Sequence, residues 1–174
     1  MPNVAEMLLR RSWRRMVGPL LAGLLSGCAT GPRLVDATTQ QLAPCPLPPH
    51  CVSSQSSDRG NAIRPLAVRT TPAADQATLR ALIAAMPRTS IVNDRPGYLY
   101  ATFETPRAGF VDDVEFVLSP DQRVFHVRSS SRIGWFDWDV NRDRVERIRV
   151  AYLEATSRET LIYSHAPRSS PEKL

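Results

Sequence analysis

The chain has 174 residues, of which 22 are Lys or Arg and 17 are Asp or Glu, so its formal net charge is +5. The basic excess lies mostly at the start, because residues 28–174 carry 18 basic and 16 acidic side chains. Nucleic-acid binding depends on Lys and Arg gathered on one face, so this near-neutral remainder gives no case for a nucleic-acid partner. Its length allows one domain with an ordinary core.

An export signal is predicted at the N-terminus. Four Arg residues within positions 10–15 precede an apolar run over Met16–Leu25, which is about half as long as a membrane span. The run ends in Leu25-Ser26-Gly27-Cys28, which resembles the lipobox of bacterial lipoproteins. The resemblance implies a signal peptide over residues 1–27, acylation of Cys28, and the lipid bilayer as a partner.

Two alternatives stay open for this segment. One is a conventional signal peptide that releases a soluble protein, and the other is a twin-arginine signal, whose motif the surrounding residues match poorly. In proteobacterial lipoproteins, an Asp after the lipidated Cys commonly retains the protein at the inner membrane. Ala29 stands there instead, so we expect a cell-envelope protein facing the periplasm, at the outer rather than the inner membrane.

Residues 28–44 are rich in Thr, Gln and Pro and are predicted to form a flexible tether. With Cys28 assigned to lipid, Cys45 and Cys51 form an even remainder in an oxidising compartment, which predicts a disulfide between them. The alternative is a metal site built from Cys45, His50 and Cys51, but no second Cys or His pair completes it. We therefore expect no metal and no cofactor.

The next elements are predicted from apolar periodicity and turn residues. A short extended segment is expected near Ile63–Val68, and Thr71-Pro72 opens a helix over Ala73–Met86. Turn residues then separate four extended segments. These segments are Thr89–Asn93, Tyr98–Glu104, Phe110–Leu118 and Arg123–Ser130.

A last helix is predicted over Val140–Ala155, with Asp137 or Asp139 as its N-cap. The order strand, helix, four strands, helix predicts one α+β domain over residues 45–160, with a disordered polar tail over 161–174. Short connections favour an antiparallel sheet of about five strands with both helices on one face. In topology this resembles the TATA-binding-protein-like class of α+β folds, without implying DNA binding.

The densest polar chemistry lies in the last two predicted strands and at the start of the last helix. A turn over residues 119–122 would place Asp113 opposite Arg128 and Glu115 opposite His126. Cross-strand ion pairs contribute about 0.2–1 kcal/mol each, so a salt-bridge ladder is one interpretation. A ligand site is the other, because arginine holds anions through paired hydrogen bonds. The candidate ligand-binding or structural cluster is Asp112, Asp113, Glu115, Arg128, Ser129, Ser131, Arg132, Asp137, Asn141 and Arg144.

An aromatic cluster over Gly134–Trp138 precedes the last helix. It either folds over the core or forms an exposed apolar patch.

Several separated motifs are similar to a bacterial family catalogued as domain of unknown function 1499. They occur in the order of that family and cover about Cys45–Tyr152. The family has no established activity or cofactor, and its members are often lipoproteins or envelope proteins. The bulky Trp135-Phe136 and Trp138 depart from the smaller residues expected in that loop. The matching pieces are Cys45-Pro46, Cys51–Ser54, Phe110–Phe116, Val127–Gly134, Asp137, Val140–Arg142 and Arg144–Glu146.

Three functions are compatible with these features. The leading hypothesis is a non-enzymatic envelope lipoprotein that binds an anionic ligand or an envelope protein through the Asp112/Asp113 and Arg128/Arg132 region. A second is a hydrolase that uses the acidic residues, His126 and the adjacent serines. No nucleophile elbow surrounds those serines, so we assign no catalytic residue and favour a protein that is not an enzyme. The third is a purely structural envelope component.

Overall fold

A computed structural model of the chain describes residues 40–46, 50–106, 109–133 and 139–165. The predicted signal peptide, Cys28, most of the tether, Asp137 and the aromatic cluster lie outside these residues. Within the described ranges, no helix is long and apolar enough to cross a bilayer.

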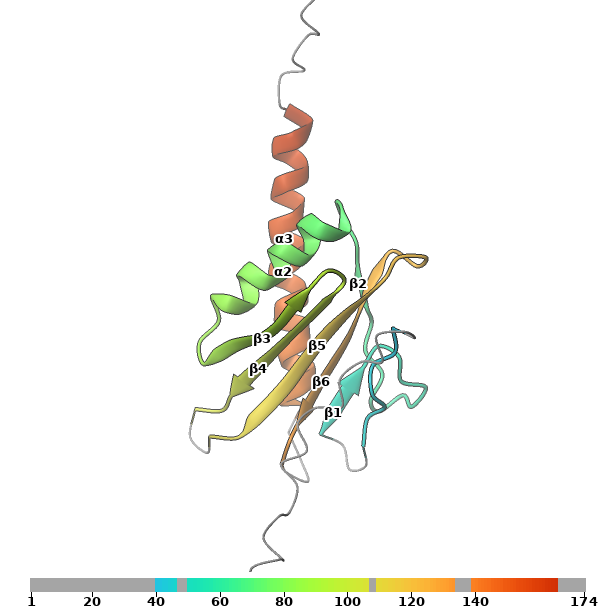
Figure 1. Cartoon of the computed structure of the whole chain (residues 1–174), viewed down its shortest axis with the longest axis vertical. Coiled ribbons are helices and arrows are strands. Elements are labelled where there is room, and N and C mark those ends of the chain that lie inside the picture. The colour runs from blue at the N-terminus through green and yellow to red at the C-terminus, as the bar shows by residue number, and fades with distance from the viewer. Residues whose placement is uncertain (1–39, 47–49, 107–108, 134–138, 166–174) are drawn as a thin grey trace, which may run out of the picture. The chain divides into compact units, whose positions relative to one another are not determined.

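The described chain forms an antiparallel sheet and two helices, which confirms the predicted α+β fold (Figure 1). The strands lie in the order β1-β6-β5-β4-β3, and the short β2 pairs with β6 beyond the end of β1. The strands are β1 (Cys51–Ser53), β2 (Leu66–Ala67), β3 (Thr89–Arg95), β4 (Tyr98–Glu104), β5 (Val111–Ser119) and β6 (Val124–Ser131). The helices are α2 (Pro72–Ala84) and α3 (Val140–His165).

Helix α2 begins where its sequence predicts. The Thr71 side chain accepts a hydrogen bond from the Ala74 amide, and Pro72 occupies the first turn, where its missing N–H is not needed. The apolar periodicity then buries Leu79 and Ile83 completely.

Helix α3 is longer than predicted, because it continues past Ala155 to His165. It therefore includes residues 161–165, which the sequence predicts as part of the disordered tail. No Gly or Pro occurs between Gly134 and Pro167, so nothing in the local sequence ends the helix earlier.

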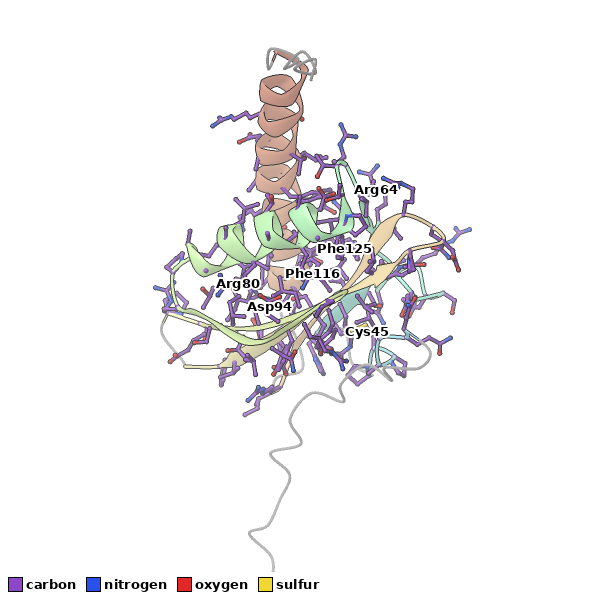
Figure 2. The ribbon with its side chains drawn as sticks, turned by 45° about the horizontal axis from the view of Figure 1, so that its top comes forward. Cys45, Arg64, Arg80, Asp94, Phe116 and Phe125 are labelled. Carbon is purple, nitrogen blue, oxygen red and sulfur yellow. A yellow bond between two sulfur atoms is a disulfide. The ribbon has the colours of Figure 1, made fainter. Side chains whose placement is uncertain are left out.

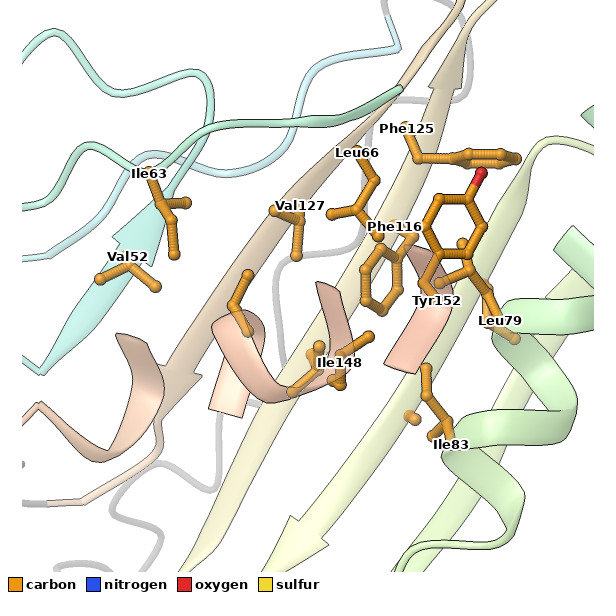
Figure 3. Close-up of a cluster of buried hydrophobic side chains, with 14 of the residues drawn as sticks. Val52, Ile63, Leu66, Leu79, Ile83, Phe116, Phe125, Val127, Ile148 and Tyr152 are labelled. Atoms are coloured by element: carbon orange, nitrogen blue, oxygen red, sulfur yellow. The ribbon is translucent and has the colours of Figure 1, made fainter. Parts of the chain in front are cut away.

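Both helices lie on the same side of the sheet, and the main core fills the space between (Figure 2). We call this side of the sheet the inner face and the opposite side the outer face. Phe116 and Phe125 project from the sheet toward Tyr152 of α3 and Leu79 of α2 (Figure 3). A second, smaller cluster of buried apolar residues contains Leu42, Tyr98, Tyr100 and Val117.

The β5–β6 register differs from the prediction. Asp113 pairs with Ser130, Glu115 with Arg128, and Val117 with His126. The loop occupies residues 120–123 rather than 119–122, because Arg123 adopts a positive φ of 52° and its amide bonds to the Pro120 carbonyl. Moving a loop by one residue shifts each cross-strand partner by two, which preserves the face on which each side chain lies.

Strand β1 has no counterpart among the predicted extended segments. It pairs with β6 through Cys51↔Ser130 and Ser53↔Arg128. Three residues are too few to show the alternation by which strands are recognised.

Candidate functional site

The alternation of side chains along β5 divides the predicted polar cluster between the two faces of the sheet. Asp112 faces inward and contacts α3, whereas Asp113 and Glu115 face outward beside Tyr100 and Tyr98. The ten residues that the sequence groups together therefore do not form one site. Nine of them are described, and they form an inner and an outer cluster.

The inner cluster lies between the sheet and the start of α3, and all its members are buried except the half-buried Ser131: Asp112, Ser129, Ser131, Asn141 and Arg144. Arg144 donates to Asp112, to Ser129 Oγ at 3.1 Å and to Asn141 Oδ1 at 2.7 Å. Asn141 Nδ2 donates to Ser131 Oγ and to the His50 carbonyl, both at 3.0 Å.

In this network the polar side chains of the inner cluster make most of their hydrogen bonds to one another. The Arg144 guanidinium also lies over the Phe103 ring, with 5.0 Å between its central carbon and the ring centroid. A buried ion pair with these additional hydrogen bonds fixes the position of α3 on the sheet, and removing either charge would leave the other uncompensated. The geometry therefore favours a structural role for these five residues.

The outer cluster is Tyr98, Tyr100, Asp113, Glu115, Arg128 and Arg132. Arg132 Nε donates to Asp113 at 3.0 Å, and Tyr100 donates to the same carboxylate at 2.7 Å. Tyr98 donates to Glu115 Oε1 at 2.8 Å, and Arg128 Nη1 lies 3.5 Å from Glu115 Oε2. The Asp113 hydrogen bond raises the pKa of Arg132.

Burial also raises the pKa values of the two tyrosine hydroxyls in the outer cluster. Burial, together with the hydrogen bond to Asp113, raises the pKa of Tyr100 to about 12. Burial raises the pKa of Tyr98 further, with the Glu115 charge adding to it. Both hydroxyls therefore stay protonated and act as hydrogen-bond donors to the carboxylates at neutral pH.

Across both clusters, each arginine faces one carboxylate: Arg144 with Asp112, Arg132 with Asp113, and Arg128 with Glu115. The three pairs leave no excess positive charge to hold an anion. One buried donor, Arg128 Nε, has no hydrogen-bond partner among the described residues.

A segment that the sequence assigned to the tether lies on the outer face. Leu42 is buried against Tyr98, Tyr100 and Val117, and its amide donates to Gln55 Oε1 at 2.8 Å. We call residues 40–46 the arm. The arm belongs to the folded domain, which begins several residues earlier than the predicted boundary at residue 45.

A groove of about 780 Å³ lies beside the arm on the outer face. Its walls are the arm, the loop that follows β1, and the β5–β6 end of the sheet. Among the described residues, the lining contains hydroxyl and amide side chains, one carboxylate and one imidazole, but no Lys or Arg. The lining residues are Gln41, Leu42, Ala43, Pro44, Cys45, Ser53, Ser54, Gln55, Ser56, Ser57, Asp58, Asn61, Gln122 and His126.

His126 lines the groove and contacts Ser54 rather than Glu115. Ser54 Oγ lies 3.1 Å from His126 Nδ1 and also accepts a hydrogen bond from the Val127 amide at 2.9 Å. Burial lowers the pKa of His126, so its neutral form, a hydrogen-bond acceptor at one nitrogen, prevails at neutral pH.

Residues 41–151 match the protein-family model described as protein of unknown function (DUF1499). The chain belongs to this family. No curated protein and no solved structure matches the chain.

The family match begins at the arm and ends in α3, so it includes both polar clusters and the groove. It also includes two buried polar residues of α2, Asp75 and Gln76, that are not among the residues predicted from sequence. Asp75 accepts hydrogen bonds from Tyr152 Oη and from the Arg69 and Thr70 amides. Burial raises the pKa of Tyr152, and the hydrogen bond to the Asp75 carboxylate raises it further. Asp75 sits in the first helical turn after Thr71, which is a recognisable capping position.

Gln76 is the second missed residue of the DUF1499 domain. Its amide donates to Asp94 and to the Arg95 carbonyl, both at 2.8 Å, and its carbonyl accepts from the Gly97 amide. It thereby fixes the β3–β4 turn against α2, beside a cavity of about 720 Å³. Arg80 and Asp94 form a surface ion pair at the same cavity (Figure 2).

The sulfurs of Cys45 and Cys51 form a disulfide, with Cα atoms 5.5 Å apart. It connects the end of the arm to β1. Among the described residues, no group of three or more His, Cys, Asp and Glu side chains could hold a metal ion.

Proposed function

We propose that this DUF1499 protein is a non-enzymatic binding module of the bacterial cell envelope, anchored through acylated Cys28 at the outer membrane. We further propose that it binds an uncharged polar ligand, rich in hydroxyl or amide groups, in the outer-face groove. The lipobox-like sequence supports the location, and the groove supports the binding role.

The composition of the groove lining carries this proposal. Four hydroxyls and four side-chain amides line a space of about 780 Å³, and the part of the chain that the structure describes brings no Lys or Arg into its lining. Such side chains both donate and accept hydrogen bonds, whereas an anion would need a compensating charge. The two arginines of the outer cluster, Arg128 and Arg132, are already paired with carboxylates, which favours an uncharged ligand over the anionic one expected from sequence.

Native mass spectrometry tests the binding role. The protein is exported to the periplasm with a conventional cleavable signal and without Cys28, purified gently, and weighed. Ser57→Trp should fill the groove, since Ser57 is exposed on its rim. Ser90→Trp, on exposed β3, is the matched control. A retained mass that only Ser57→Trp abolishes supports the proposal. A bare protein mass, or a ligand that survives Ser57→Trp, contradicts it.

The anchor is tested separately by Cys28→Ala. We expect the substituted protein to lose the mass of the acyl chains and to leave the membrane fraction. Unchanged mass, processing and fractionation would show that the lipobox interpretation is wrong.

One observation favours a hydrolase as the second candidate function: the contact between Ser54 and neutral His126 resembles a nucleophile and its base. Labelling of Ser54 by a fluorophosphonate probe, lost in His126→Ala, would support it. The absence of labelling at neutral pH would leave the pair a structural contact between β6 and the loop after β1.

A further inference from the structure

Helix α3 has an exposed face directly opposite the face that packs on the sheet. Val145, Ile148 and Tyr152 are fully buried on the packed face. The residues on the opposite face are separated by steps of three and four, which places them on one line along the helix. We call these residues the α3 stripe: Asp143, Arg147, Val150, Ala151, Glu154 and Arg158.

The charges of the α3 stripe complement those of a reversed second copy. From Asp143 to Arg158, the residues of the α3 stripe are in turn acidic, basic, apolar, acidic and basic. If two α3 helices pack antiparallel, with a two-fold axis between Val150 and Ala151, Arg147 of each copy faces Glu154 of the other. The same axis places Asp143 opposite Arg158. In a parallel pair, like charges would face each other, so the pattern selects the antiparallel arrangement.

These four charged side chains have no ion-pair partner among the described residues. Asp143 and Arg147, like Glu154 and Arg158, have the spacing for a pair within one helix, yet the structure forms neither pair. The other arginines of α3 differ, because Arg142, Arg144 and Arg149 all bond to the β1–β2 connection or the sheet.

The apolar centre of the α3 stripe is also uncovered. Val150 is 56% exposed, the second largest exposure among the large hydrophobic residues of the described chain, and Ala151 beside it is half-buried. Figure 1 shows the C-terminal part of α3 extending beyond the sheet and beyond α2.

We propose that two copies of this chain associate through the α3 stripe, in an antiparallel and two-fold symmetric helix pair. This inference is independent of the proposed ligand groove. Each contact occurs twice in such an interface, because the same surface is used by both copies. The complementary charges set the register, and Val150 supplies the apolar contact at the axis.

Sedimentation velocity of the protein without Cys28, over a concentration series in low salt, tests the pairing. Arg147→Glu and Glu154→Arg should each weaken the dimer at least about tenfold, because each substitution opposes like charges at two places. The double variant Arg147→Glu/Glu154→Arg exchanges the signs and should restore dimerisation to within about threefold. Arg59→Glu, an exposed change of the same size on the loop after β1, should have no effect.

Recovery in the double variant distinguishes the proposed register from a general loss of folding or a change in net charge. The dimer should also weaken as salt is raised, since the pairs are exposed to solvent. A monomer at every concentration up to about 1 mM, the affinity of a weak contact, would overturn the proposal. So would a dimer that Arg147→Glu leaves intact, or a double variant that stays as weak as the single ones.

Discussion

Replacing Arg144 by Met should cost this domain a large part of its stability. Arg144 contributes hydrogen bonds to Asp112, Ser129 and Asn141, all of them buried. Met fills a similar volume but leaves the Asp112 carboxylate buried without a counter-charge. Breaking a buried ion pair in this way costs about 3–5 kcal/mol, against a total of about 5–15 kcal/mol for a typical domain.

Urea unfolding followed by circular dichroism measures this cost. Arg80→Met is the matched control, because its ion pair with Asp94 is on the surface and the Arg80 side chain is 54% exposed. We expect the control to lose no more than about 1 kcal/mol. The double variant Asp112→Leu/Arg144→Met should be more stable than Arg144→Met alone, because it removes the unpaired charge.

The slope of the unfolding free energy against urea should stay unchanged in all three variants, so that the differences report stability. If Arg144→Met costs no more than Arg80→Met, the inner cluster does not hold α3 on the sheet. Its residues would then be free for the binding role that the sequence suggested.

Three further outcomes are expected. Leu42→Ala should cost about 2 kcal/mol in urea unfolding, because Leu42 is buried against Tyr98, Tyr100 and Val117; no loss would mean that the arm does not pack on the outer face. Unfolded but unreduced protein without Cys28 should not react with a thiol reagent if Cys45 and Cys51 are joined, and two reacting thiols would contradict the bond. The free energy of unfolding should fall between pH 10 and pH 12, because the pKa of Tyr100 is about 12 in the folded protein and the unfolded chain loses that proton at lower pH. If a Tyr100→Phe variant loses stability equally steeply over this range, Tyr100 is not the cause.

The local sequence was sufficient for elements that carry their own signals. Helix α2 has a cap at Thr71 and an apolar period that includes Leu79 and Ile83, and both features are present in the structure. The faces of β5 and β6 also followed from alternation. The register of these strands did not, because it depends on whether Arg123 adopts a left-handed conformation, which few non-glycine residues do.

The candidate site was predicted less well than the fold. Sequence proximity placed Asp112 and Asp113 together, but neighbouring residues in a strand face opposite sides of the sheet. The partners that decide their roles, Arg144 and Tyr100, come from other elements. The groove could not be predicted, since its walls come from the arm, the loop after β1 and the end of β6, which only the three-dimensional fold brings together.

The arm limits how far an anchored domain can move from a membrane. In the sequence prediction the tether extended to residue 44, but the chain is held by the domain from residue 40 onward. For a chain anchored at Cys28, this leaves 12 residues between lipid and domain. Such a length spans about 40 Å when fully extended. Because Gln41 and Leu42 line the groove, a ligand in the groove of an anchored protein would be bound within about this distance of the bilayer surface.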